Sequence, residues 1–329
     1  MQGENSVQNE LFERAKRFQE NNPIVSFADL KNNNLCDQQF LDPVWKISSQ
    51  KNGESAFSNN LLHTLLYVRN ICKLSFNTIE GIEACSAKSW LAQEHNPERN
   101  LEGGGIMTVI RANHLEKSAV NMSCVWGPSY PALEGENAGK PFSATGVSLI
   151  SHPRNPYAPI MHLNIRCIQV KDGNKVTTWI AGGADLTPMH NFEEDTVLFH
   201  DAMKKVCERN SNIANYEKYK KWADEYFYIP HRKEARGVGG IFFDFVKIEN
   251  EHDFSLLLDV GQYAAKAYAE ILSRRIELPY DEELAEKHLY WRGRYAEFNL
   301  VYDRGTRFGL MTGGNHEAIF CSLPPRVKW

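Results

Sequence analysis

The strongest constraint on the fold is a run of alternating residues near the middle of the chain, residues 160–169. Its apolar members are Met161, Leu163, Ile165 and Cys167, and its polar members are His162, Asn164 and Arg166. Because side chains alternate between the two faces of a β-strand, this pattern predicts a half-buried strand with an imidazole, an amide and a guanidinium on one face. A sheet needs no such group for stability, so the polar face is a candidate site.

Other periodic segments indicate that strands and helices come in blocks. Strands are predicted at residues 106–111, 120–126, 160–169, 176–182, 238–246, 295–302 and 317–322. Helices are predicted at residues 9–20, 193–207, 216–226 and 254–274, and at 58–72 with Ser58 as the N-cap, whereas residues 24–57 are expected to be irregular. Because short turns join consecutive strands, the pattern favours an α+β fold with an antiparallel sheet.

Composition excludes several classes of function. Hydrophobic residues make up 42% of the 329 residues, and a net charge of −4 argues against a general nucleic-acid binder. No apolar run approaches the roughly 20 residues of a transmembrane helix, and the first residues, MQGENSVQNE, resemble neither a secretory signal nor a transit peptide. A cytoplasmic location is therefore expected. The seven scattered cysteines are predicted to be reduced core residues.

Arginines next to aromatic residues and glycines favour a planar ligand with several carboxylates, because a guanidinium can pair with a carboxylate and stack on a ring. A binding role is predicted for Arg166, Arg232 and Arg236, the last two within HRKEARGVGG. Ion pairing with nearby carboxylates is the favoured interpretation for the remaining cluster, Arg292, Arg294 and Arg307. No nucleotide-binding glycine motif or nucleophile elbow is found.

Asp185 and the histidines leave alternatives open. Asp185, in GGADLTP, fits a helix N-cap or turn as well as a catalytic carboxylate. Together with Asp185, four histidines could in principle hold a metal, namely His152, His162, His200 and His231. None of them has the paired spacing of a facial triad, so a metal site is the less favoured interpretation. His162 differs from the others because it shares a strand face with Asn164 and Arg166.

Long motifs in the second half of the chain resemble the oxygen-dependent coproporphyrinogen III oxidase family. They are GVSLISHPRNPYAPIMHLNIR, WIAGGADLTP, YKKWADEYFYIPHRKEARGVGGIFFD, RGRYAEFNLVYDRGTRFGL and CSLPP, in the order and spacing of that family. The resemblance implies a catalytic domain at residues 102–329, with residues 1–101 as a helical or irregular extension packed on it. It also implies a large antiparallel sheet of about seven strands with helices on both faces.

The resemblance further implies an activity in haem biosynthesis. The family converts two propionates of coproporphyrinogen III to vinyls, giving protoporphyrinogen IX, with O2 as the electron acceptor. It acts as a homodimer and is expected to need no metal or organic cofactor; a bound metal would use the four histidines. Two rival hypotheses are a non-haem iron oxygenase that uses His162 and Asp185, and a tetrapyrrole-binding protein without catalysis.

Matching positions carry the family's site residues into this chain. His162 corresponds to the proton donor, Asp185 to a carboxylate facing the pyrrole nitrogens, and Arg232 and Arg236 to functional arginines. The resemblance implies that these four residues and Arg166 are the catalytic residues. The implied substrate contacts are Ser148, Asn164, Ile165, Arg166, Gly313, Gly314 and Asn315. The chain departs from the family at Glu102, where a glycine is usual, and at Asn315, where an arginine is usual and His316 could replace the contact. Family members are also expected to continue beyond CSLPP.

Overall fold

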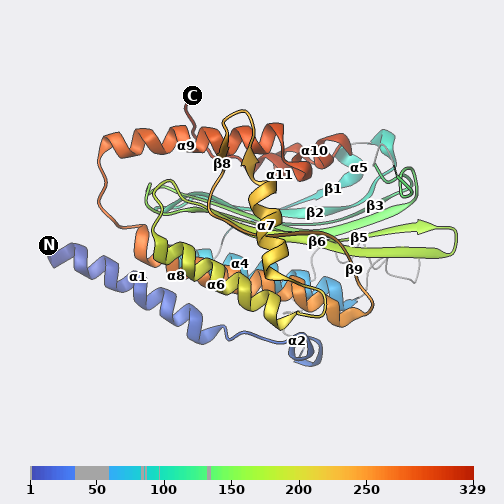
Figure 1. The fold of residues 1–329 in the computed structure, drawn as a ribbon, viewed down its shortest axis with the longest axis horizontal. Helices are drawn as coiled ribbons and strands as arrows, with labels where there is room; N and C mark the ends of the chain where they lie inside the picture. The colour runs from blue at the N-terminus through green and yellow to red at the C-terminus, as the bar shows by residue number, and fades with distance from the viewer. Residues whose placement is uncertain (1, 34–58, 83–84, 86, 96, 132–134) are drawn as a thin grey trace.

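A single antiparallel sheet runs through the protein (Figure 1). The computed structural model describes residues 2–33, 59–82, 85, 87–95, 97–131 and 135–329. Its sheet has seven strands in the order β1-β2-β3-β4-β5-β6-β9. These strands are β1 (Ala87–Leu91), β2 (Glu102–Ile110), β3 (Leu115–Gly127), β4 (Phe142–Pro153), β5 (Ile160–Asp172), β6 (Lys175–Thr187) and β9 (Gly239–Lys247). A short hairpin, β7 (Tyr228–Ile229) and β8 (Glu234–Ala235), precedes β9.

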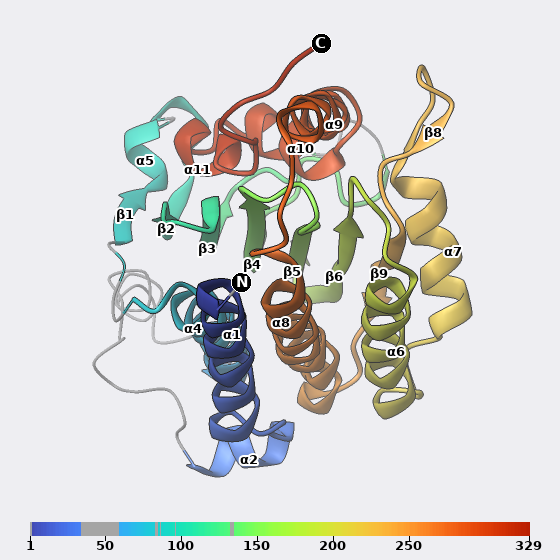
Figure 2. The same ribbon diagram turned by 90° about the vertical axis from the view of Figure 1, so that its left-hand side faces the viewer.

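Helices cover both faces of the sheet (Figure 2). One layer contains α1 (Gln2–Asn21), α4 (Asn59–Glu80), α6 (Glu193–Arg209) and α8 (Ser255–Arg275), with α2 (Phe27–Asn33) below it. The opposite layer contains α9 (Glu282–Val301), α10 (Arg304–Met311) and α11 (His316–Phe320), with α5 (Ala92–His95) near the β1 edge. Helix α7 (Tyr216–Tyr226) packs beside β9. The predicted α+β architecture with helices on both faces is confirmed.

The apolar face of β5 forms part of the main core. Leu163 and Ile165 are fully buried in one cluster with Leu257 of α8 and Leu65 of α4. Phe18 brings α1 into the same cluster. Because this face is filled, the polar side chains of β5 must point toward the layer of α9, α10 and α11. Helices and a strand from before residue 102 thus share the core and the sheet, and the division at residue 101 stays a prediction.

Two predicted strands are wrong. Residues 295–301 belong to α9, which Tyr302 ends, and residues 317–322 overlap α11, while β1 and β4 complete the sheet in their place. The aromatic and branched residues of YAEFNLVY suggested a strand, but Tyr295, Phe298 and Asn299 are buried at helical spacing, and Asp281 caps the helix start. Strand β4 was missed because its core face, which carries Val147 and Leu149, also buries three small polar side chains, Ser143, Thr145 and Ser151, which interrupts the apolar alternation.

The N-terminal region contains a helix that was not predicted, and the described cysteines are mostly buried. Helix α2 lies within the stretch predicted to be irregular, and Ser58 lies outside the described residues. The described cysteines are free, and burial raises the pKa of Cys72, Cys124 and Cys167 to about 12. Five of the described cysteines are buried as predicted, Cys85 is half-buried, and Cys36 lies outside the described residues. Among the described helices, none is long and apolar enough to cross a membrane.

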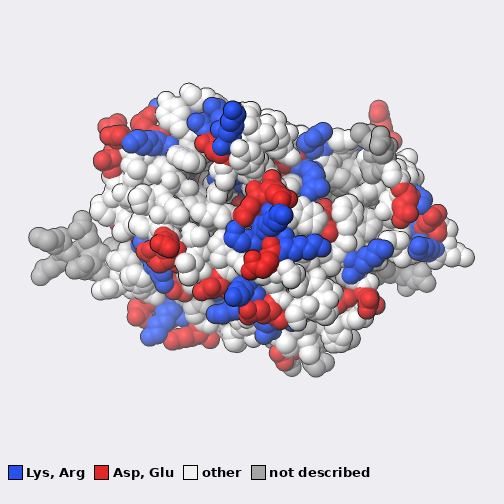
Figure 3. All heavy atoms as spheres, viewed as in Figure 1, with Lys and Arg blue, Asp and Glu red and all other residues white. Residues whose placement is uncertain are grey.

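The face shown in Figure 3 carries charges of both signs close together. On α7, Lys220 pairs with Asp224 at 2.6 Å and Lys221 approaches Glu225 at 4.0 Å. Such pairs leave no single-sign field over this helix, as expected from the nearly balanced composition.

We expect stability to fall between pH 7 and pH 5 because of His288 in α9. Burial, together with the nearby Arg292 and Arg326, lowers the pKa of His288 to about 3 from a value of 6.5, although Glu116 opposes the shift. The unfolded chain therefore binds a proton below pH 6.5 that the folded chain does not bind until about pH 3, and the folded state loses stability as pH falls. His288→Gln should reduce the pH 7 to pH 5 difference in unfolding free energy by about 2 kcal/mol. Urea denaturation at both pH values measures this, and an unchanged difference would contradict it.

Candidate active site

The register of β4, β5 and β6 brings the polar residues together at the centre of the sheet. Asn164 lies between Ser148 and Gly183, and His162 lies opposite Asp185. Directly paired residues of antiparallel strands project from the same face, so these side chains share one surface. Arg166 is paired with Gly146, where an added Cβ would come 2.9 Å from the Arg166 Cβ. A glycine at this position therefore leaves the guanidinium room to cross the sheet.

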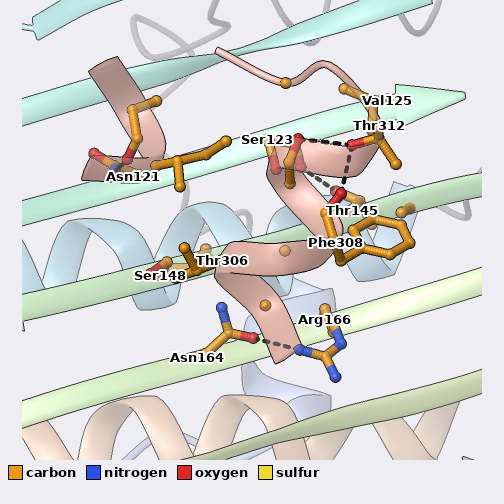
Figure 4. A pocket seen from close by; sticks show the side chains of 18 of the residues that line it. Asn121, Ser123, Val125, Thr145, Ser148, Asn164, Arg166, Thr306, Phe308 and Thr312 are labelled. Atoms are coloured by element: carbon orange, nitrogen blue, oxygen red, sulfur yellow. Dashed lines mark hydrogen bonds between the residues drawn. The ribbon is translucent and has the colours of Figure 1, made fainter. Parts of the chain in front are cut away.

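A cavity of about 440 Å³ lies over this face, under the loop and helix layer that includes α10 and α11. Figure 4 shows Asn164 and Arg166 side by side on β5, with Thr306 and Phe308 of the α10 region across from them. The lining is divided by chemistry. Polar lining residues include His162, Asn164, Arg166, Asp244, Asp303 and Arg304, and apolar ones include Trp90, Leu101, Tyr130, Phe142, Trp179 and Phe308.

His162 is hydrogen-bonded to a buried ion pair formed by Asp185 and Arg236. Its Nδ1 lies 2.9 Å from Oδ1 of Asp185, and the other carboxylate oxygen, Oδ2, accepts a hydrogen bond from Nη2 of Arg236. Asp185 and Arg236 are each only 2% exposed. Aromatic rings enclose the guanidinium, with its centre 4.1 Å from the ring of Phe227 and 4.7 Å from that of Phe298. Each carboxylate oxygen of Asp185 thus accepts a hydrogen bond from another side chain of the protein.

Asp185 is held in its ionised form. Burial alone would raise the pKa of its carboxyl group, but the charge of Arg236 and the hydrogen bond from His162 outweigh burial and lower it. An ionised carboxylate can only accept, so Nδ1 of His162 is the donor in this contact. The second ring nitrogen, Nε2, remains for a ligand in the cavity that His162 lines. The arrangement fixes the tautomer of the imidazole.

All seven predicted substrate contacts line one cavity. They are Ser148, Asn164, Ile165, Arg166, Gly313, Gly314 and Asn315, and His162 lines the same cavity. Ile165 contributes its backbone, because its side chain is buried in the core on the opposite face. Asp185 lies in β6 behind His162, so it caps no helix and reaches the cavity only through that histidine. The role of Asp185 opposite the pyrrole nitrogens stays a prediction.

Arg232 occupies a different setting from Arg236. Its guanidinium forms a two-point ion pair with Glu297 of α9, with Nη2–Oε1 at 2.5 Å and Nε–Oε2 at 3.0 Å. His231 contacts the same carboxylate at 2.9 Å. The hydrogen bond from Arg232, joined by that from His231, lowers the pKa of Glu297 to about 2. The structure thus places Arg232 in an ion pair, and its catalytic role stays a prediction.

Asn315 lines the cavity and is also the N-cap residue of α11. Its Oδ1 accepts hydrogen bonds from the backbone N–H groups of Glu317 at 2.9 Å and Ala318 at 3.3 Å, which caps α11. His316 is exposed and lies outside the described lining residues. The geometry therefore gives no support to His316 as a substitute for the usual arginine contact.

The four histidines of the possible metal site lie in separate environments. His152 is buried with Nε2 2.9 Å from the carbonyl oxygen of Ser322, and burial holds its pKa well below the usual value. The Nδ1 of His200 contacts the hydroxyl of Tyr216 at 2.9 Å, while His162 and His231 contact carboxylates as described. Within the described ranges, no group of three histidine, cysteine, aspartate or glutamate side chains is arranged to hold a metal ion.

The structure adds cavity residues that the sequence reasoning missed. Asp244 ends the run IFFD, and in YDRGTRFG Asp303 caps α10, whose first residue is Arg304. Their signal was a charged residue directly after an apolar segment, but residues 295–302 were read as a strand, which hid the helix junction. For Arg292 and Arg294 the ion-pair interpretation is confirmed, with Glu116 at 2.6 Å and Glu234 at 3.0 Å.

A cavity with a partly polar lining, backed by an imidazole, a carboxylate and a guanidinium, indicates an enzyme with an α+β fold. Comparison with known proteins gives its family: the model of the family described as coproporphyrinogen III oxidase matches residues 67–329. The chain belongs to this family. It is 47% identical over 237 residues to the oxygen-dependent coproporphyrinogen-III oxidase of Rickettsia bellii (strain OSU 85-389), covering 70% of this chain and 83% of that protein. The proteins of the same name from Rickettsia akari (strain Hartford) and Rickettsia rickettsii (strain Sheila Smith) are 47% and 46% identical over the same shares.

Proposed function

We propose that this enzyme oxidatively decarboxylates two propionates of coproporphyrinogen III to vinyl groups, giving protoporphyrinogen IX for haem biosynthesis. The supporting observation is a single cavity that combines Arg166 and Arg304 with His162 held by a buried carboxylate. For each propionate, the side chain CH2CH2COO⁻ reacts with O2 and one proton to give a vinyl group, CO2 and H2O2. The substrate supplies both electrons, and O2 accepts them.

The arginines of the cavity bind the propionates in this proposal. Arg166 is loosely held, with Nη1 3.2 Å from Oδ1 of Asn164 and Nη2 3.4 Å from Oδ2 of Asp244. Arg304 lies over the rings of Tyr226 and Phe242, at 5.0 and 5.5 Å, and makes no ion pair with a described residue. Both guanidinium groups can therefore turn a pair of donors toward a carboxylate. Holding the propionates fixes which ring faces His162.

His162 handles the proton in this proposal. Each turnover consumes one proton per propionate, and an imidazolium that donates Nδ1–H to Asp185 can release the proton on Nε2 toward the cavity. Asp185 is the positioning residue, since it orients the ring and stabilises its charge without touching the ligand. Arg236 in turn keeps Asp185 ionised.

The direct test is incubation of the protein with coproporphyrinogen III, first without and then with O2. We expect binding in both cases and protoporphyrinogen IX only with O2, with one H2O2 formed per vinyl group. Turnover should persist after exhaustive chelation, because we propose that O2 is the only co-substrate and that no metal or organic cofactor is required. Loss of turnover that iron restores would support the non-haem iron alternative, and tight binding without product would support a tetrapyrrole-binding protein.

A homodimer in the cytoplasm completes the proposal. Both parts come from the sequence and from the family resemblance. Exposed apolar side chains on α9 and α10, Leu300, Val301, Leu310 and Met311, are consistent with a contact surface there.

A further inference from the structure

Strand β9 contains a bulge beside the cavity. Ile180 pairs with Val246 and Gly182 pairs with Phe243, so Ala181 alone faces two residues, Asp244 and Phe245. In a regular strand these consecutive side chains would point to opposite faces, but both of them line the cavity. Bulges next to a site characteristically redirect a side chain in this way.

The backbone of Phe245 is held in an unfavourable conformation. Its φ is +53°, in the left-handed region that bulky residues rarely adopt. Its N–H donates to Oδ1 of Asp244 at 2.9 Å, and the other oxygen of that carboxylate lies 3.4 Å from Nη2 of Arg166. One carboxylate therefore fixes both the bulge and the guanidinium proposed to bind a propionate.

The side chain of Phe245 is as unusual as its backbone. It is 62% exposed although it lines the cavity, so the ring lies at the opening. The ring stacks on the buried Trp179, with centroids 5.8 Å apart and an angle of 25° between planes. The positive φ would favour glycine at position 245, and solvent exposure would favour a polar side chain. An aromatic side chain satisfies neither demand, which points to a contact made only when a ligand is present.

We propose that Phe245 is a substrate-positioning residue, whose ring packs against the apolar edge of a pyrrole ring at the cavity opening while Arg166 binds the propionate on the same edge. Asp244 links the two contacts by holding both groups. The inference rests on the proposed function for the identity of the ligand. It adds an apolar contact on the side of the cavity where the guanidinium provides the polar one, so the enzyme would select a ring that carries both features.

The test replaces Phe245 with glycine and with tyrosine. Phe245→Gly removes the ring and relieves the backbone strain, so we expect unchanged or higher thermal stability together with a roughly five- to tenfold higher KM for coproporphyrinogen III and a kcat near that of the wild type. Phe245→Tyr keeps an aromatic ring, so its KM for coproporphyrinogen III should be close to that of the wild type. The Kd for coproporphyrin III, the oxidised and unreactive form of the substrate, should rise in parallel for Phe245→Gly.

Two control variants separate the loss of the Phe245 ring contact from relief of backbone strain and from the general loss of an exposed aromatic side chain. Lys233→Gly relieves the other strained position with a long exposed side chain, at φ +55°, and should affect stability without affecting Kd. Tyr280→Leu removes an exposed aromatic residue outside the lining and should leave KM unchanged. Unchanged KM and Kd in Phe245→Gly, or a loss of stability that accounts for the change, would overturn the inference. Wild-type turnover is measured first and tests the proposed function alone, while Kd tests the Phe245 contact even without turnover.

Discussion

Asp185→Asn is expected to lower kcat by about 10²- to 10⁴-fold, the range that general acid–base groups contribute. The asparagine keeps the size of the side chain but removes the charge that stabilises a protonated His162, and it allows the imidazole to adopt the other tautomer. The substrate contacts remain, since Asp185 is buried behind the histidine. We therefore expect KM to change little. Steady-state kinetics with coproporphyrinogen III measure both constants, and a near-normal kcat would rule out the proposed role.

A second pair of variants separates catalysis from stability. Asp185→Leu leaves the guanidinium of Arg236 buried without its partner, which should cost about 3–5 kcal/mol of unfolding free energy. Adding Arg236→Met removes the unpaired charge and should recover much of that loss, because the methionine can fill the space among Phe227, Tyr295 and Phe298. The double variant should be folded and inactive. Recovered activity in it would show that the charge on Asp185 is dispensable.

Arg166→Ala is expected to raise KM by about 10- to 100-fold, since a hydrogen bond to a charged group contributes about 1.5–3 kcal/mol. The substitution also leaves Asp244 as an uncompensated carboxylate in the lining, which would repel a propionate. Arg166→Lys keeps the charge but loses the paired donors, so its KM should lie between those of the wild type and the alanine variant.

The control for this prediction is Lys218→Ala. Lys218 is an exposed cation on α7, outside the cavity lining, and its removal changes the net charge by the same amount as Arg166→Ala. Equal effects on KM would mean that the loss at Arg166 is a general charge effect, and the proposed propionate contact would be abandoned. Measuring both variants at two salt concentrations strengthens the comparison, because screening acts mainly on exposed charges.

The sequence predicted the fold where one period dominated. Alternation located β5, whose apolar face is buried in the core, and helical spacing located α8, whose predicted apolar stripe is part of the same core. It failed for α9, whose buried Arg292 and His288 disguise the inner face, and for β4, whose core face includes the polar residues Ser143, Thr145 and Ser151. Local pattern carries no information about such tertiary burial.

The sequence likewise predicted only part of the candidate site. That His162, Asn164 and Arg166 share a face follows from period two alone. The partnership of His162 with Asp185 needs the strand register, and that of Asp185 with Arg236 joins residues 51 apart in the chain. Spacing alone cannot place Asp303 and Arg304 over the sheet, because their position depends on where α9 ends.

His162 and Asp185 are carried by one hairpin, in which Asp172 pairs with Lys175 across a two-residue turn, whereas Arg236 arrives with the segment that leads into the edge strand β9. Edge elements open more readily than central ones in native-state fluctuations. When this edge separates, the histidine–carboxylate pair stays together but loses the cation that keeps it ionised. The protonation state of Asp185 thus depends on the strand beside it at the margin of the sheet.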